Sequence, residues 1–314
     1  MDGPYNLSAQ ETAALTRRMT TLSVATALVL AALKAGVWLA SGSVSILASL
    51  ADSTLDLAAA LGTFAAVRYA AAPPDAEHRF GHGKAEAFAS LMQAGLVFAS
   101  AALIGEEAIR RLIAPQPIGR EGWAIAVMAV SILLTGLLVA AQSRMLRRAR
   151  SVAVTGDRAH YAADLISNVV ALLAIAATAL FGFTSFDALG GLAVAAVLLW
   201  GAVGVFRTAS DELMDHELPQ TARARIVALM TEDPRLTDVH QLRTRASGPI
   251  VHIQMHADLD PELTLETAHQ VVVAAEKRVL EAFPAADIII HADPRGRAEP
   301  HGGAFPEAHA RAET

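Results

Sequence analysis

Six long apolar stretches occupy the chain before about residue 207, and they constrain its fold more than any other feature. They lie near 20–41, 46–70, 86–108, 122–143, 159–182 and 186–207. The hydrocarbon core of a bilayer is about 30 Å thick, so about 20 helical residues are needed to cross it. We therefore predict a membrane domain of six spanning helices over 17–207, preceded by an N-terminal cytoplasmic segment, 1–16. The first stretch is too long for the apolar core of a cleavable signal peptide, so we expect it to remain as a helix.

The distribution of Lys and Arg predicts the orientation of these helices. With six spans, the two termini lie on the same side as the loops that follow the second and fourth spans. Before the C-terminal region that side carries ten basic residues: Arg17, Arg18, Arg68, Arg79, Lys84, Arg144, Arg147, Arg148, Arg150 and Arg158. The opposite side carries three: Arg110, Arg111 and Arg120. Because basic residues accumulate in cytoplasmic loops, we expect both termini in the cytoplasm.

The pattern changes after Phe206, where shorter segments of mixed polarity begin. An amphipathic helix is expected from about 218 to 230, followed by strands at 238–246 and 250–258, a helix at 263–282 and a strand at 287–291. The segment 250–258 alternates apolar and polar residues, as a half-buried strand does. The order αββαβ predicts a small two-layer α+β domain over 208–293. The tail 294–314 is rich in Gly, Pro, Ala and charge, and we expect it to be disordered.

The composition excludes several kinds of chemistry. The chain has no cysteine, so disulfides, thiolate metal sites and cysteine nucleophiles are excluded. A metal held by this chain must accept nitrogen and oxygen ligands, which disfavours Cu(I). The net charge of −6 gives no indication of nucleic-acid binding.

Ionisable residues inside two of the apolar stretches are the strongest functional signal. Asp52 and Asp56 lie in the second stretch, and His160 and Asp164 lie in the fifth. The i, i+4 spacing of each pair places both side chains on one face of a helix. Charged groups at membrane depth are costly and usually functional, and four such ligands suit the tetrahedral N/O coordination of Zn²⁺. Lys34 in the first stretch is either a counter-charge to this site or an interhelical hydrogen-bonding lysine.

Two further groups of ligand-type residues lie outside the apolar stretches. In the loop after the second stretch, Asp75, His78 and His82 form a plausible three-ligand clip, with Gly81 and Gly83 permitting a tight turn. The C-terminal region contains His240, His256, His269, His291 and Asp293. His291 and Asp293 share a strand face because they are two residues apart, but the sequence alone does not show that all five converge. His252 shares the face of His256, so it is either an additional ligand or, as we favour, a polar residue on a solvated strand face.

The residues that carry these signals match a known family. The chain resembles the cation diffusion facilitators, and within them bacterial zinc- and iron-efflux metal/proton antiporters, from about Arg17 to Pro294. The matching motifs are SGSVSILASLADSTLD, EHRFGHGKAE, DRAHYAADLISN, HQLRTRASGP and IIIHADP. The resemblance implies a homodimer of six-span subunits, each with a ferredoxin-like cytoplasmic domain, in the inner membrane of a bacterium.

The resemblance also implies roles for individual residues. It implies an intramembrane transport site at Asp52, Asp56, His160 and Asp164, and a loop site at Asp75, His78 and His82. It implies a binuclear cytoplasmic site formed by His240, His256, His269, His291 and Asp293, with Asp293 bridging. Lys84 and Asp215 are implied to form a charge interlock near the dimer interface. One departure is Ala292, which stands where close relatives carry Gln, so an additional contact to the cytoplasmic metal is absent if that Gln supplies one.

Ligand chemistry predicts a mechanism for such a chain. Metal binding needs neutral His160 and ionised aspartates, so metal and protons compete for the same groups. We expect a transporter, not an enzyme, that exports a divalent cation, Zn²⁺ before Fe²⁺, Cd²⁺, Co²⁺ or Mn²⁺, in exchange for protons. The cytoplasmic site would bind metal as a regulator and bias the membrane domain. A non-transporting metal sensor in the membrane is the main alternative, and an intramembrane metalloenzyme is disfavoured because no HExxH motif is present.

Overall fold

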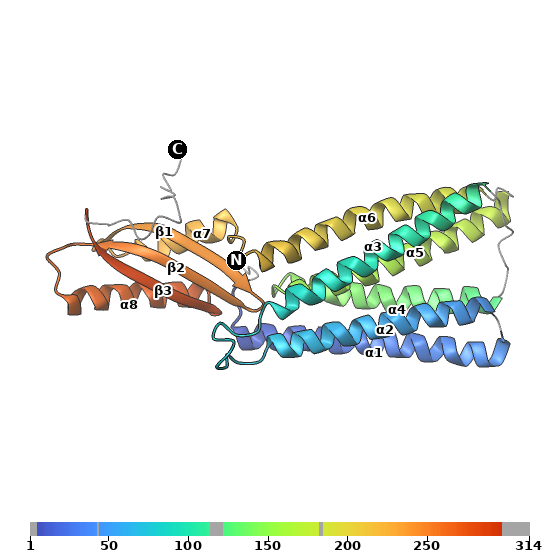
Figure 1. Ribbon diagram of the computed structural model, residues 1–314, viewed down its shortest axis with the longest axis horizontal. Helices are drawn as coiled ribbons and strands as arrows, with labels where there is room; N and C mark the ends of the chain where they lie inside the picture. The colour runs from blue at the N-terminus through green and yellow to red at the C-terminus, as the bar shows by residue number, and fades with distance from the viewer. Residues whose placement is uncertain (1–4, 43, 114–121, 182–184, 297–314) are drawn as a thin grey trace.

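The chain folds into a helical bundle and a smaller α/β domain at one end of it (Figure 1). The computed structural model describes residues 5–42, 44–113, 122–181 and 185–296. The bundle contains six helices: α1 (Ala9–Ser41), α2 (Val44–Ala70), α3 (Ala85–Ile113), α4 (Gly122–Leu146), α5 (Val152–Phe181) and α6 (Ser185–Leu213). Five of them are long and apolar enough to cross a membrane, α1, α2, α3, α4 and α6. The predicted architecture of six helices followed by an αββαβ domain is confirmed.

The helices extend beyond the apolar stretches that predicted them. The helix α1 starts at Ala9, where Ser8 and Glu11 form a capping box: the Ser8 hydroxyl accepts from the Glu11 backbone N–H, and the Glu11 carboxylate accepts from that of Ser8. This reciprocal pair satisfies two donors that a helix start leaves free. Hydropathy marks the part of a helix that lies in lipid, whereas capping marks where the helix begins, so the two limits differ.

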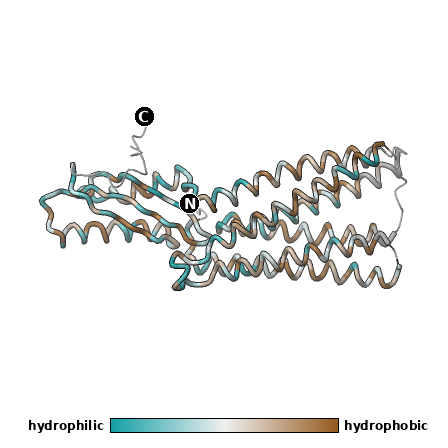
Figure 2. Tube along the Cα trace, viewed as in Figure 1, coloured by the Kyte–Doolittle hydropathy of each residue, from teal (hydrophilic) through white to brown (hydrophobic). Residues whose placement is uncertain are grey.

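Large apolar side chains cover the outside of the bundle, as lipid contact requires. Leu39 and Trp200, for example, are 77% and 81% exposed. Figure 2 shows hydrophobic residues along the bundle helices, whereas hydrophilic residues concentrate in the α/β domain and in the loop beside it. In Figure 1 the helices α3, α5 and α6 lie on one side and α1, α2 and α4 on the other, and the two groups draw apart at the end far from the α/β domain.

The C-terminal domain has two helices on one face of a three-stranded sheet. Its elements are α7 (Gln220–Met230), β1 (Leu236–Ser247), β2 (Ile250–Leu259), α8 (Leu265–Ala282) and β3 (Ala286–Pro294). The sheet order is β1-β2-β3, with β1 antiparallel and β3 parallel to β2. Ile253 and Met255 of β2 pack with Ile226 of α7 and Val271 of α8 in a core with almost no solvent contact. The alternate residues of β2 therefore face away from the helices. The expected disordered tail lies mostly outside the described residues.

Candidate metal centres

The structure brings together three of the four ligand-type residues inside the bundle. We call Asp56, His160 and Asp164 the membrane cluster; one ligand atom of each lies within 4.8 Å of those of the other two. His160 Nε2 lies 3.1 Å from Asp56 Oδ1 and 3.7 Å from Asp164 Oδ2. The His160 side chain is 7% exposed, whereas those of Asp56 and Asp164 are 17% and 27% exposed. The cluster thus has a buried imidazole and two carboxylates that remain partly accessible.

Asp52 and Lys34 lie beside this cluster. Asp52 is exposed and falls outside the compact group, although it is near enough for its charge to act on Asp56 and His160. Lys34 Nζ donates to Ser53 Oγ at 2.6 Å and to the Ser49 carbonyl oxygen at 3.2 Å. Lys34 belongs to α1 and both acceptors belong to α2, so these hydrogen bonds are interhelical. This is the second of the two interpretations given for Lys34.

A buried polar cluster about one helical turn from His160 was missed by the sequence analysis. Asp157 of α5 accepts hydrogen bonds from Ser23 of α1 at 2.5 Å, Gln142 of α4 at 2.8 Å and Gln93 of α3 at 3.3 Å. Gln93 also donates to Thr63 of α2 at 2.9 Å. These five side chains are at most 2% exposed and connect five helices. The one local signal for this cluster was Asp157 itself, three residues before His160. The residues that hydrogen-bond to Asp157 are distant in sequence, so no motif indicated them. We call this group the five-helix polar cluster.

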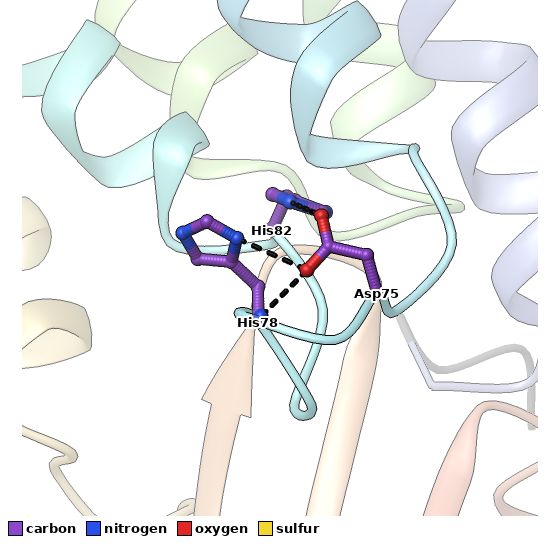
Figure 3. A group of neighbouring side chains, drawn as sticks. All are labelled: Asp75, His78 and His82. Carbon is purple, nitrogen blue, oxygen red and sulfur yellow. Dashed lines mark hydrogen bonds and ion pairs between the residues drawn. The ribbon is translucent and has the colours of Figure 1, made fainter.

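The loop after α2 gathers its three ligand-type residues (Figure 3). In this loop cluster Asp75 Oδ1 lies 3.2 Å from His78 Nδ1, and Asp75 Oδ2 lies 3.3 Å from His82 Nε2. Asp75 also accepts from the backbone N–H groups of His78 and Glu77, which holds the pKa of its carboxyl below its usual value. His82 is 7% exposed. The aspartate is therefore ionised and already aimed at both imidazoles.

Two glycines give the loop its shape. Gly81 has φ +79°, a left-handed conformation that favours glycine. Gly83 lies so close to the turn between β1 and β2 that a Cβ atom there would be 2.2 Å from the Ser247 carbonyl oxygen. The loop cluster is thus held directly against the α/β domain.

We expect Gly83→Ala to separate the loop from this turn and to lower the thermal midpoint of the purified protein by several degrees. The added methyl cannot be accommodated without moving one of two backbones, a change that typically costs about 1–3 kcal/mol. Gly95→Ala is the matched control, because a Cβ at this helical position meets nothing within 4 Å and alanine is about 1 kcal/mol better in a helix. Equal midpoints for the two variants would contradict the close packing of Gly83.

The α/β domain gathers three histidines around one aspartate on its open sheet face. Asp293 Oδ2 lies 2.8 Å from His256 Nδ1 and 3.4 Å from His240 Nε2, and Asp293 Oδ1 lies 3.2 Å from His291 Nε2. The Asp293 side chain is 7% exposed. Because strand pairing places His240, His256 and His291 opposite one another, the sheet itself aligns the three rings. One carboxylate contacting three imidazoles can bridge two ions.

Other residues of this region differ from the expected set. His269 is exposed on α8 and does not join any described group of ligand-type residues. His252 is 5% exposed; its Nδ1 lies 3.0 Å from Asp287 Oδ2 and its ring meets Phe80 edge-on. The interpretation of His252 as a solvated strand residue is therefore wrong, because the loop after α2 covers it. Asp238 and Asp258, which the sequence analysis did not single out, approach His240.

Ion pairs join the bundle to the α/β domain. Lys84 Nζ lies 3.0 Å from Asp215 Oδ1, and Arg245 Nη1 lies 3.2 Å from Asp215 Oδ2. Partial burial acts to raise the pKa of Asp215, but the hydrogen bonds and charges of Lys84 and Arg245 hold it below its usual value. Glu212 pairs with Arg150 at 2.9 Å and accepts from the Gly248 backbone N–H at 2.9 Å. Within one subunit, these contacts connect the segments just before α3 and α5 and the end of α6 with β1 and the turn that follows it.

Comparisons with known proteins agree with this arrangement. Residues 20–214 match the model of the cation efflux transmembrane domain, and residues 218–295 match that of the cation efflux protein cytoplasmic domain. The chain is 39% identical over 280 residues to the cation-efflux pump FieF of Escherichia fergusonii, covering 89% of this chain and 93% of the relative. It is 40% identical over 272 residues to FieF of Shewanella oneidensis, covering 87% and 92%.

Among solved structures, the zinc form of the transporter CzrB is 31% identical, with a TM-score of 0.26, and covers 27% of this chain and 99% of its own. The transmembrane match spans more than half of the chain, and it includes every residue of the membrane cluster and of the loop cluster. The chain belongs to the cation diffusion facilitator family and is a multi-pass cation-efflux transporter, not an enzyme.

Proposed function

We propose that this protein exports a divalent transition-metal cation, with Zn²⁺ as the favoured cargo, in exchange for protons. The observation that carries the proposal is the membrane cluster, in which His160 lies within 3.7 Å of carboxylate oxygens of both Asp56 and Asp164. One imidazole and two carboxylates form a mixed N/O set of the kind that Zn²⁺ accepts. Asp52, one turn from Asp56 on α2, would complete four ligands once its side chain turns inward. Fe²⁺, Cd²⁺, Co²⁺ and Mn²⁺ remain alternative cargoes.

Proton exchange follows from the same atoms. An ion at the membrane cluster needs the lone pair of His160 Nε2 and ionised carboxylates, so loading the metal displaces protons. After the metal leaves, protons from the side of release can bind the imidazole and carboxylates. When the cluster is exposed to the cytoplasm again, these protons are carried inward. Alternating exposure of this one cluster therefore exchanges metal for protons without a second pathway.

We also propose that the other two clusters bind Zn²⁺ as a regulator and that the protein acts as a homodimer in the bacterial cytoplasmic membrane. Gly83 and the Lys84–Asp215 pair connect the loop cluster to the α/β domain. A metal bound at either cluster shifts the equilibrium between the two conformations of the membrane helices only if it binds those two conformations with different affinity. The position of Asp293 among three imidazoles supports its role as a bridging ligand.

Purified protein in liposomes tests the transport proposal. A zinc-sensitive dye and a pH-sensitive dye inside the vesicles report both movements. We expect zinc entry to be accompanied by proton exit, and an acidic interior to accelerate zinc entry. Zinc binding without entry would instead support the alternative of a non-transporting sensor, and zinc entry that is indifferent to the pH gradient would exclude proton exchange.

A further inference from the structure

Lys34 of α1 brings a positive charge into the interior of the bundle. The residue is 8% exposed, and its Nζ donates to Ser53 Oγ and to the Ser49 carbonyl oxygen, both of them neutral groups. An ammonium group has three N–H donors, and the third has no acceptor among the described residues, none of which forms an ion pair with Lys34. The hydrogen bonds therefore fix the position of the ammonium group but leave its charge uncompensated.

The two acceptors place this charge beside the aspartates of α2. Ser49 is three residues before Asp52, and Ser53 is three residues before Asp56. Residues three apart are neighbours on a helix surface, with about 5–6 Å between their Cβ atoms. The serine pair that binds Lys34 thus adjoins the aspartate pair of the proposed transport site, and the ammonium group lies next to that site without being one of its ligands.

The charge of Lys34 matches the site to a divalent cation. The ammonium group is close enough for its charge to act on all three aspartates of the site, which are Asp52, Asp56 and Asp164. Three ionised carboxylates contribute −3, the ammonium group contributes +1 and a neutral His160 contributes nothing, so the set carries −2. A bound divalent cation then gives a set without net charge, which avoids the cost of an uncompensated charge at membrane depth. Without Lys34 the loaded set would keep a charge of −1.

A fixed positive charge this close also weakens the binding of a cation. Coulomb repulsion between like charges falls off slowly with distance, and salt screens buried charges much less than exposed ones. The ammonium group therefore lowers the affinity of the aspartates for the ion. Differences in affinity at one site are expressed mostly in the rate of dissociation, so a weaker hold speeds release. A transporter needs this release, because an ion that stays on the aspartates blocks the next cycle.

We propose that Lys34 sets the affinity of the transport site: its ammonium group matches the charge of the site to a divalent cation and speeds the release of that cation. Ser49 and Ser53 hold the ammonium group in place for this role. The inference rests on the proposed transport site, because it requires the cation to bind at the membrane cluster. A lysine that only joined α1 to α2 would be different, because the loss of either hydrogen-bonding partner would then have the same effect.

Zinc binding by the full-length protein in lipid nanodiscs tests this role. Each protein is titrated at about pH 8, where protons compete less for the ligands, with and without an added Asp56→Asn substitution. The difference between the two titrations is the binding that requires Asp56. We expect Lys34→Met, which keeps the length of the side chain but removes its charge, to bind Zn²⁺ at this site at least about tenfold more tightly than the wild type. Its maximal rate of zinc entry into liposomes should fall at least about fivefold, because the ion leaves more slowly.

Further variants separate the charge of Lys34 from its hydrogen bonds. Lys34→Arg keeps the charge, so we expect an affinity within about threefold of the wild type. Ser53→Ala removes the shorter hydrogen bond but keeps the charge, so its affinity should change much less than that of Lys34→Met. Lys277→Met makes the same substitution at an exposed position of α8, and it should equal the wild type in both assays. Lys34→Gln is a second neutral variant that keeps the test valid if Lys34→Met misfolds.

An affinity no tighter than that of the wild type in both Lys34→Met and Lys34→Gln would overturn the proposal. An equal gain in Ser53→Ala would also overturn it, since that variant keeps the charge. Liposome flux separates these outcomes from the transport proposal. A site that tightens in Lys34→Met, in a protein whose wild type moves no zinc, supports the role of Lys34 in binding and refutes transport. Unchanged affinity in a protein that transports normally does the reverse, and a wild type without any binding that requires Asp56 refutes both.

Discussion

Asp56→Asn is expected to reduce zinc flux in liposomes to the background of empty vesicles. The substitution preserves the size of the side chain but removes the negative charge that lies 3.1 Å from His160 Nε2. A metal held by the remaining imidazole and carboxylate loses one of its closest ligands, and the uncompensated positive charge of the ion is costly at membrane depth. Initial rates of zinc entry, measured at equal amounts of reconstituted protein, give the comparison.

Asp211→Asn is the control for this experiment, because Asp211 is an exposed aspartate near the end of α6, far along the chain from the membrane cluster. We expect its flux to match that of the wild type. Undiminished flux in Asp56→Asn would exclude the membrane cluster as the transport site. Asp52→Asn adds a further comparison: loss of flux there as well would place Asp52 among the ligands, although its side chain lies outside the compact group.

Glu212→Ala is expected to destabilise the contact between the bundle and the α/β domain, lowering the free energy of unfolding by about 3–5 kcal/mol. This is the usual effect of removing one partner of a buried ion pair. The Glu212 side chain is fully buried, pairs with Arg150 and accepts from the Gly248 backbone N–H. Alanine would leave the Arg150 guanidinium and this N–H without their acceptor. Thermal unfolding and the rate of proteolysis near residues 213–218 measure the effect.

Glu212→Gln separates the two contributions in the same assays. Glutamine still offers an oxygen to the Gly248 N–H but loses the ion pair, so we expect a smaller loss than for alanine. Glu281→Ala, at an exposed position of α8, should leave both measurements within error of wild type. A Glu212→Ala protein as stable and as protease-resistant as wild type would show that the joint depends on other contacts.

Most of the architecture was predictable because it depends on local patterns. Stretches of apolar residues gave the helices of the bundle, and the alternation from Ile250 to Asp258 gave a strand that the structure extends by one residue, to Leu259. Spacing was equally informative where all ligands lie on one short segment. Asp75, His78 and His82 converge as their spacing suggested, because a single turn around Gly81 brings them together.

Contacts between distant segments were not predictable in the same way. Asp157 was not singled out from the sequence, since nothing local indicates its hydrogen bonds from Ser23, Gln93 and Gln142. Asp258 was overlooked for a similar reason. Its proximity to His240 depends on the register of two strands and on the bulges in β1, and one sequence does not encode that register in any short motif.

The five-helix polar cluster has a mechanical consequence for a transporter of this shape. Side chains from α1, α2, α3, α4 and α5 meet there, so rearrangements that keep its hydrogen bonds are restricted to tilts about that point. Phe181, the last residue of α5, lies about 36 Å from Asp157 at about 1.5 Å per residue. For a cargo bound at the proposed transport site, a small tilt of the helices about this cluster displaces their far ends, where the two groups of helices draw apart, more than it displaces the ion.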